Sequence, residues 1–252
     1  MFFTESGREI TVAAGSPTLK RGGPVRPHMQ LADGVYALSQ TVEHEEGPTT
    51  VHPAAVETER GVVLLDVGFR DQLDQLSGAL ENAGHDFEDV WAALITHQDG
   101  DHAGALADVV DRTDAVVMAH RECAPYLDGR EDPIKGDGDR YPPVSVDVEL
   151  VDGVRLSTAA GPMEVVFTPG HAPGHVSLYF PGEKLLIAGD ALTAREGDVA
   201  PPSEEYTLDY EEATESVGRL SEYDVFRTLC YHGGFAEQGT GAIAKLWNEL
   251  VA

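Results

Sequence analysis

The sequence has little lysine, few cysteines and no long apolar run, and each shortage excludes a class of protein. The longest apolar runs, at 61–65 and 185–188, have the length of strands and fall far short of the ~20 residues of a membrane-spanning helix. The first ten residues contain acidic side chains and no basic region ahead of an apolar stretch, so they do not resemble a signal peptide. We therefore expect a cytoplasmic protein that does not bind membranes.

The cysteine content excludes a disulfide framework. Cys123 and Cys230 are the only cysteines, and no Cys-x-x-Cys pair is present. Cys230 lies in the apolar-leaning run 225–231, where we expect a small buried side chain that packs. Any bound metal would then have histidine and carboxylate ligands.

Lysine occurs four times, and the chain has 17 basic residues against 44 acidic ones, for a formal net charge of -27. Nucleic-acid binding needs cationic contacts to phosphate, so this charge argues against it. The acidic residues are spread along the whole chain. Such a surface repels itself at low salt, and molar salt, with a Debye length of ~3 Å, screens the repulsion. The composition resembles that of proteins from salt-loving archaea, with an acidic mesophilic protein as the alternative.

The apolar pattern predicts an α+β fold. Residues 1–30, rich in Gly, Pro and polar side chains, are expected to form an irregular leader, and 31–252 a single domain. Short apolar runs predict strands at 35–42, 54–58, 62–67, 91–96, 115–119, 146–151, 163–167, 176–180, 185–188 and 226–231. Helical spacing predicts helices at 70–83, after the turn 97–101, at 121–127, at 209–220 and after Thr240, which can act as a cap.

Both halves run from strands to helix–strand pairs, which predicts two similar halves that face each other. That arrangement is a four-layer αββα sandwich with the helices outside and two sheets inside. Residues 128–143, charged and punctuated by Pro and Gly, predict either a domain linker or a long surface loop.

The segment 94–104, LITHQDGDHAG, contains the strongest indication of chemistry. It follows a predicted strand and opens a helix, and it holds His97, Asp99, Asp101 and His102. Alternate positions of an extended turn point the same way, so the first three can converge, and His102 adds a nitrogen ligand. Zinc, iron and manganese accept imidazole and carboxylate. The alternative is a solvated acidic turn that caps a helix.

Three further segments place metal-type side chains at strand ends. FTPGHAPGH carries His171 and His175, LLIAGDAL ends an apolar strand with Asp190, and TLCYHGG ends one with His232. A buried carboxylate without a partner is costly, and a bound cation would remove that cost at Asp190; a helix cap is the alternative there. One sheet edge would bring all four segments together.

These motifs resemble the metallo-β-lactamase-fold hydrolases, whose first signature is T-H-x-H-x-D-H. Residues 96–102 read T-H-Q-D-G-D-H, and LLDVG with Asp66, the GHxPGH loop, the strand-end GD and the final strand-end His follow in the family's order over about residues 34–235. Asp99 stands where the family usually has His. A branch of predicted hydrolases with THQDxDH, related to glyoxalase II and lactonases, is similar to this sequence.

The resemblance implies a centre of two divalent metal ions. The first would take His97, Asp99 and His171, the second Asp101, His102 and His232, and Asp190 would bridge them. Asp66 and His175 would orient the ligands without binding an ion. We expect zinc, with Fe(II) or Mn(II) as alternatives because Asp99 adds a hard anionic ligand. We expect surface or packing roles for His28, His44, His52, His85 and His120.

The expected activity is hydrolysis of an ester, thioester or lactone-type bond in a small molecule by a metal-bound hydroxide, with Asp101 positioning the water or accepting its proton. A glutathione thioester is disfavoured because about 20 residues with one Lys follow His232. Tyr206 and Tyr210 are candidates for a lactonase tyrosine. The missing signal peptide disfavours a β-lactam substrate, and the acidic surface disfavours a nuclease. An iron-dependent oxidoreductase and a non-catalytic metal-binding module are the alternatives.

Overall fold

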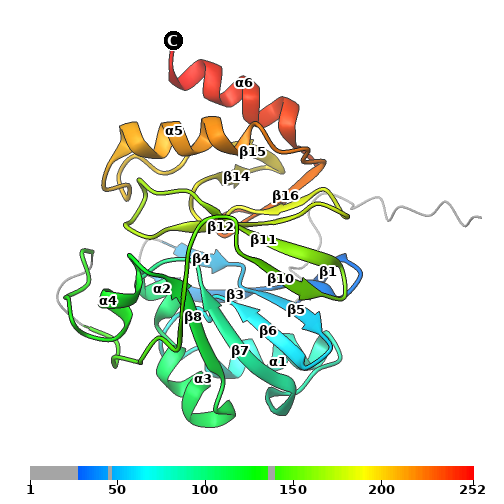
Figure 1. Ribbon diagram of the computed structural model, residues 1–252, viewed down its shortest axis with the longest axis vertical. Coiled ribbons are helices and arrows are strands. Elements are labelled where there is room, and N and C mark those ends of the chain that lie inside the picture. The colour runs from blue at the N-terminus through cyan, green and yellow to red at the C-terminus, as the bar shows by residue number, and fades with distance from the viewer. Residues whose placement is uncertain (1–27, 45–46, 136–139) are drawn as a thin grey trace, which may run out of the picture.

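The computed structural model describes residues 28–44, 47–135 and 140–252 (Figure 1). The predicted leader 1–30 lies almost wholly outside these residues. Its last three residues, however, belong to β1 (His28–Ala32), which pairs with β2 (Val35–Leu38). Leu31 and Ala32 are buried in this strand, so the chain enters the sheet earlier than its Gly- and Pro-rich start predicts.

The first half forms a seven-stranded sheet. It begins with the antiparallel strands β1, β2, β5 and β6 and continues with β7, β8 and β9, each parallel to its predecessor. The further strands are β5 (Ala54–Thr58), β6 (Gly61–Leu65), β7 (Val90–Ile95), β8 (Val116–His120) and β9 (Val148–Leu150). The central strands are covered on both faces, which is why they are nearly continuous apolar runs such as GVVLL.

Helices cover one face of this sheet (Figure 1). The helical elements of the first half are α1 (Leu73–Asn82), η1 (Phe87–Asp89), α2 (Gly100–Ala103), α3 (Leu106–Thr113) and α4 (Ala124–Leu127). Leu76 and Leu80 of α1 and Val109 of α3 pack against the sheet in one buried cluster. Their helical spacing matches the expected amphipathic pattern.

The second half forms a six-stranded sheet that α5 (Tyr210–Leu220) and α6 (Thr240–Leu250) cover. Its strands in spatial order are β10 (Arg155–Thr158), β11 (Gly161–Phe167), β12 (Val176–Phe180), β13 (Leu185–Ile187), β16 (Arg227–Cys230) and β17 (Gly234–Ala236). β13 and β16 run parallel, and the other neighbours are antiparallel. Two hairpins stand apart from the large sheets: β3 (Gln40–His44) with β4 (Gly47–Val51), and β14 (Thr193–Arg195) with β15 (Asp198–Ala200).

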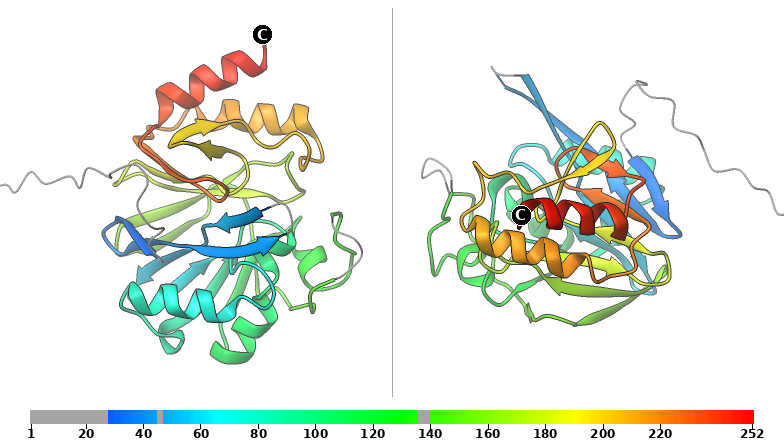
Figure 2. Two further views of the ribbon diagram at one scale, coloured as in Figure 1. Left: turned by 180° about the vertical axis from the view of Figure 1, so that it is seen from behind. Right: turned by 90° about the horizontal axis from the view of Figure 1, so that it is seen from above.

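The two sheets face each other, and the helices lie outside them (Figures 1 and 2). A second buried cluster, including Leu94 from the first sheet and Leu178 and Phe180 from the second, fills the space between the sheets. A third cluster joins the second sheet to α5 and α6. These layers confirm the predicted α+β, four-layer αββα sandwich. No helix among the described residues has the length and apolar content needed to cross a membrane.

Three local predictions were wrong. The run 35–42 divides between β2, which pairs with β5 in the large sheet, and β3, which pairs with β4 in a separate hairpin. The helix after the 97–101 turn breaks between α2 and α3: the N–H of Ala105 donates to Gly68, and the carbonyl of Asp101 accepts from the Tyr231 hydroxyl instead. Thr240 is the first residue of α6, and its hydroxyl donates to Tyr223 without capping the helix.

The stretch 128–143 is a loop within the first half, as far as the described residues show. β9 follows it and returns to the first sheet, so it is no linker between the halves. Tyr141 anchors the loop: its ring is buried and its hydroxyl donates to the carbonyl of Gln98 at 2.7 Å. The loop therefore lies beside the 97–102 turn.

Candidate metal centre

Four strand ends carry the side chains that the sequence singled out. β7 leads to His97 and the turn to His102, β11 to His171, β13 to Asp190 and β16 to His232. β7 belongs to the first sheet and the other three to the second. β11, β13 and β16 run in the same direction, so their carboxyl ends meet at one edge of the sandwich. The fold thus brings residues that are up to 135 positions apart to one place.

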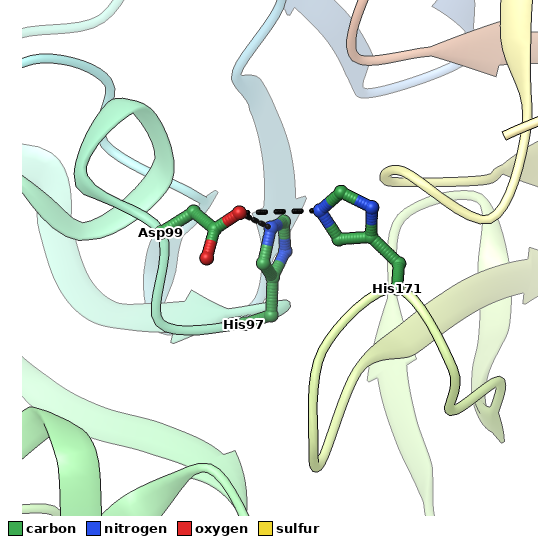
Figure 3. Close-up of side chains that lie close together, drawn as sticks. All are labelled: His97, Asp99 and His171. Atoms are coloured by element: carbon green, nitrogen blue, oxygen red, sulfur yellow. Dashed lines mark hydrogen bonds and ion pairs between the residues drawn. The ribbon is translucent and has the colours of Figure 1, made fainter. Parts of the chain in front are cut away.

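Three of these side chains form a first group (Figure 3). The Nε2 atom of His97 lies 3.4 Å from Oδ2 of Asp99, and Nε2 of His171 lies 3.2 Å from the same oxygen. His97 and His171 are fully buried, and the Asp99 side chain is 13% exposed. The carboxylate and both ring nitrogens therefore point toward a common position.

A second group joins Asp101, His102 and His232. Oδ2 of Asp101 lies 3.1 Å from Nε2 of His232 and 3.8 Å from Nε2 of His102. His102 sits in α2 and is fully buried, whereas His232 follows β16 and is about one-third exposed. The group therefore spans both halves of the chain.

Asp190 lies between the two groups. Its Oδ2 is 3.4 Å from Nε2 of His171 and 3.3 Å from Nε2 of His232, and its Oδ1 is 3.5 Å from Nε2 of His102. One carboxylate thus reaches a histidine of the first group and two of the second. This is the position that a bridging ligand would need.

Unsatisfied polar atoms show that the residues fit metal ions. Among the described residues, buried side-chain atoms without a hydrogen-bond partner include Nε2 of His97, Oδ1 of Asp99, Nε2 of His102 and Oδ1 of Asp190. A buried polar atom without a partner destabilises a fold, so such atoms are rare. Four of them in one cluster, all imidazole nitrogens or carboxylate oxygens, indicate that this donor set suits divalent ions.

Hydrogen bonds behind the cluster orient two of the histidines. Nδ1 of His102 lies 2.8 Å from Oδ2 of Asp66, and Oδ1 of Asp66 accepts from the backbone N–H of Thr96 at 2.7 Å. The Thr96 hydroxyl donates to Asp66 and lies 3.1 Å from Nδ1 of His97. Both rings therefore have their Nδ1 engaged, which leaves Nε2 to face the cluster.

His175 supports Asp190 from behind. Its Nε2 accepts the backbone N–H of Asp190 at 2.9 Å, so Nδ1 carries the proton and contacts the Thr168 hydroxyl at 2.9 Å. Thr168 in turn lies 3.0 Å from Ser177, which donates to the carbonyl of Ala188. Both ring nitrogens are thus engaged within the protein, and His175 orients the strand end.

The charges of the cluster hold its carboxylates ionised. Burial acts to raise the pKa of Asp99, but the ring of His97 and the close contact with His171 outweigh it and lower that pKa. The pKa of Asp190 is lowered in the same way, since His102 and His232 outweigh its burial. Burial acts to lower the pKa of His232, and Asp190 and Asp101 raise it to about 10. In the metal-free chain, protons therefore balance the negative charge.

Two side chains at the cluster were missed by the sequence reasoning. Tyr231 stacks on His102 with ring centroids 3.6 Å apart, and Lys135 contacts Asp99 and His171. Tyr231 directly precedes the proposed ligand His232 in the YHGG segment, so its position in the sequence could have indicated that it lies near the site. Lys135 lies in a charged loop without any motif, and only the folded chain brings it to the site.

The structure gives the surroundings of three of the other histidines. His120 stacks on Phe167, and His85 pairs with Glu57 at 3.0 Å. His52, expected at the surface or in packing, lies next to the cluster, where its Nδ1 is 3.0 Å from the carbonyl of Tyr231. The lactonase candidate Tyr206 is largely exposed, in the segment that also holds Thr207, whose hydroxyl lies 3.3 Å from Nδ1 of His171.

Comparison with known proteins identifies relatives. The chain is 29% identical over 210 residues to the probable metallo-hydrolase YflN of Bacillus subtilis, a match that covers 68% of this chain and 75% of that protein. It is 32% identical over 116 residues to a hydroxyacylglutathione hydrolase of Rhizobium meliloti, which covers 46% of this chain but 38% of that enzyme. The second likeness is therefore confined to part of each protein.

Solved structures share the fold. A metallo-beta-lactamase family protein from Thermus thermophilus superposes with a TM-score of 0.70 at 24% identity, covering 88% of this chain and 79% of that one. A subclass B3 metallo-beta-lactamase of Bradyrhizobium japonicum gives a TM-score of 0.68 at 18% identity, over 90% and 91%. The family described as the metallo-beta-lactamase superfamily matches residues 47–232, which contain every residue of the cluster. The chain therefore belongs to the metallo-beta-lactamase superfamily.

Proposed function

We propose that this chain is a hydrolase that uses two divalent cations to cleave an ester, thioester or lactone-type bond in a small molecule. The observation that carries the proposal is the set of buried, unpartnered Nε2 and Oδ1 atoms that converge at the carboxyl ends of β7 and β13. A purely structural cluster would pair these atoms with one another or with backbone groups.

The two groups give each cation its own ligands. His97, Asp99 and His171 would hold the first, and Asp101, His102 and His232 the second, with Asp190 shared. Bound there, the cations would supply Lewis acidity, which lowers the pKa of water toward ~7 and polarises a carbonyl. The protein's own contribution is to fix the ligands through Asp66 and His175, so that little reorganisation accompanies the reaction.

Asp101 is the carboxylate best placed to move a proton. Its side chain is 23% exposed, against 13% for Asp99 and 9% for Asp190, so it is the one that water and substrate reach most easily. In the proposed reaction, Asp101 accepts the proton of the attacking water as the bond to the carbonyl carbon forms. It then returns the proton to the departing oxygen or sulfur.

Asp99 bears on which ions bind. A carboxylate is harder than the histidine usual at this position, and harder ligands suit Fe(II) and Mn(II) better than zinc. We propose zinc as the ion of the hydrolase and keep an iron-dependent oxidoreductase as the second candidate, which Asp99 favours. Elemental analysis and visible absorption of protein purified in high salt without added metal distinguish the two, because only iron gives coloured protein.

The test of hydrolysis uses two matched histidine variants. His171→Ala removes a proposed ligand, whereas His85→Ala removes a partly exposed histidine that pairs with Glu57 and contacts none of the proposed ligands. We expect the wild type and His85→Ala to hydrolyse at least one member of an ester, thioester and lactone panel, and His171→Ala to lose most of that activity. Activity that resists chelators, or full activity in His171→Ala, would overturn the proposal.

A further inference from the structure

A lysine reaches the first group of the metal centre. Lys135 follows α4 in the loop that Tyr141 anchors, and its side chain is 23% exposed. Its Nζ lies 2.7 Å from Oδ2 of Asp99 and 2.9 Å from Nε2 of His171. These two atoms are the ones that would ligate the first cation.

The direction of these hydrogen bonds matters. A lysine ammonium has only hydrogens to offer, so both Asp99 and His171 must present lone pairs to it. A metal ion takes the same lone pairs at ~2.0–2.2 Å. The ammonium therefore occupies the side of Asp99 and His171 from which a cation would approach, and two positive centres there would repel each other.

We propose that the Lys135 ammonium competes with the first metal ion, so that this ion binds only when the lysine leaves Asp99 and His171. The inference rests on the proposed metal centre and adds a control on how that centre fills. In the ranges 28–44, 47–135 and 140–252, no lysine or arginine pairs with Asp101 or Asp190. The second group meets no such side-chain cation, so Lys135 should affect the binding of the first ion alone.

Asp99 explains why the lysine comes here. The short 2.7 Å contact is an ion pair between the ammonium and a carboxylate that is almost buried. A histidine at this position, as in the usual family pattern, would offer no negative charge for Lys135. The residue that departs from the family signature is thus the partner that draws Lys135 into the site.

The test measures metal binding, not activity. Zn²⁺ is titrated against a competing chelator of known affinity, with the wild type, Lys135→Met and Lys135→Ala. Lys135→Met keeps an aliphatic side chain and removes the charge. Lys245→Ala is the control, because Lys245 is exposed and pairs with Glu249 on α6. Thermal melts check that all variants fold.

We expect the wild type to bind two zinc ions. In both Lys135 variants one of the two ions should bind about 10- to 100-fold tighter, because a charge-assisted hydrogen bond no longer has to break, while the affinity for the other ion stays unchanged. Lys245→Ala should match the wild type.

The other outcomes distinguish a failure of the Lys135 inference from a failure of the proposed metal centre. Unchanged or weaker binding of the first ion in Lys135→Met, or tightening in Lys135→Ala alone, would overturn the role of the charge while leaving the metal centre intact. A wild type that takes up no zinc would overturn the metal centre itself.

Discussion

The hydroxyl of Tyr231 donates to the backbone carbonyl of Asp101 at 2.6 Å, across 130 positions of sequence. The same ring stacks on His102 at 3.6 Å. Tyr231 thus ties the end of β16 in the second half to the 97–102 turn of the first. In a continuous helix the backbone N–H of Ala105 would donate to the Asp101 carbonyl. The Tyr231 hydroxyl bonds to that carbonyl instead, and α2 stays short.

Replacing Tyr231 tests whether its hydrogen bond to the Asp101 carbonyl stabilises the contact between the two halves. Tyr231→Phe keeps the stacked ring but leaves the Asp101 carbonyl unpaired, so the free energy of unfolding should fall by ~1–3 kcal/mol. The turn should also loosen, which weakens binding of the second ion severalfold in a chelator-competition titration. The control is Tyr36→Phe, whose lost hydroxyl pairs with Glu57 away from the site. It should leave metal binding unchanged; equal metal binding in both variants would contradict this role of Tyr231.

Asp66 should strengthen the binding of the second ion by orienting His102, without binding the ion itself. Asp66→Asn keeps the shape but removes the negative charge that orients His102, and we expect ~10- to 100-fold weaker metal binding at the second group. Asp71→Asn is a matched control, because Asp66 and Asp71 both have positive φ, 58° and 65°, and Asp71 is exposed. Isothermal calorimetry with Zn²⁺ measures both. Wild-type affinity in Asp66→Asn would show that His102 needs no such support.

Metal binding should release protons and strengthen with pH. In the metal-free chain burial acts to lower the pKa of His102 and of His232, but Asp190 and its neighbours outweigh burial, raise both, and bring the pKa of His232 to about 10. Each ring must lose its Nε2 proton to ligate. Affinity for the second ion should therefore rise by about tenfold per pH unit for each proton released, between pH 7 and 9.

The same shift has a consequence for the metal-free protein. Because folding raises the pKa of His232 above its ordinary 6.5, the stabilisation of the folded state by this histidine is fully present below about pH 6.5 and is lost as the pH rises through about 10.

For metal binding, titrations in buffers of different ionisation enthalpy count the protons that are released when the ion binds. Affinity that stays constant from pH 7 to 9 would show that the histidines are already neutral.

The acidic surface predicts stability that depends on salt. With 44 acidic and 17 basic residues, like charges dominate, and raising the salt from 0.1 M to 1 M shortens the Debye length from ~10 Å to ~3 Å. We expect the melting temperature to rise by at least ~4 °C, equivalent to more than about 1 kcal/mol, in KCl and in NaCl alike. Scanning calorimetry measures it. An unchanged or falling melting temperature would favour the merely acidic mesophilic alternative.

Much of the fold was predictable because apolar runs carry local information. The runs at 54–58, 176–180 and 185–188 became β5, β12 and β13 within a residue, since most of their side chains are buried whichever face they point to. The strands β1, β4, β10, β14, β15 and β17 were missed. Of these, β10, β14, β15 and β17 are only three or four residues long, and their pairing with a neighbour defines them more than their own sequence does.

The candidate site was predictable where chemistry and strand ends coincide. All seven proposed ligands lie in one cluster, because each lies within four residues of a strand end or opens the helix after one: His97, Asp99, Asp101, His102, His171, Asp190 and His232. Tyr231 and Lys135 were missed, although Tyr231 directly precedes His232 in the sequence. The contact of Tyr231 depends on how the two sheets meet, and that of Lys135 on the path of a loop, and neither leaves a periodic trace in the sequence.

The most direct measurement is an anomalous difference map from crystals of the metal-loaded protein, collected at the absorption edge of the bound element. The account predicts two peaks ~3.5–4 Å apart. One should lie ~2.0–2.2 Å from His97, Asp99 and His171, the other at that distance from Asp101, His102 and His232, and Asp190 should touch both. Peaks elsewhere in the molecule, or none after loading, would contradict the central claim that these side chains hold a pair of cations.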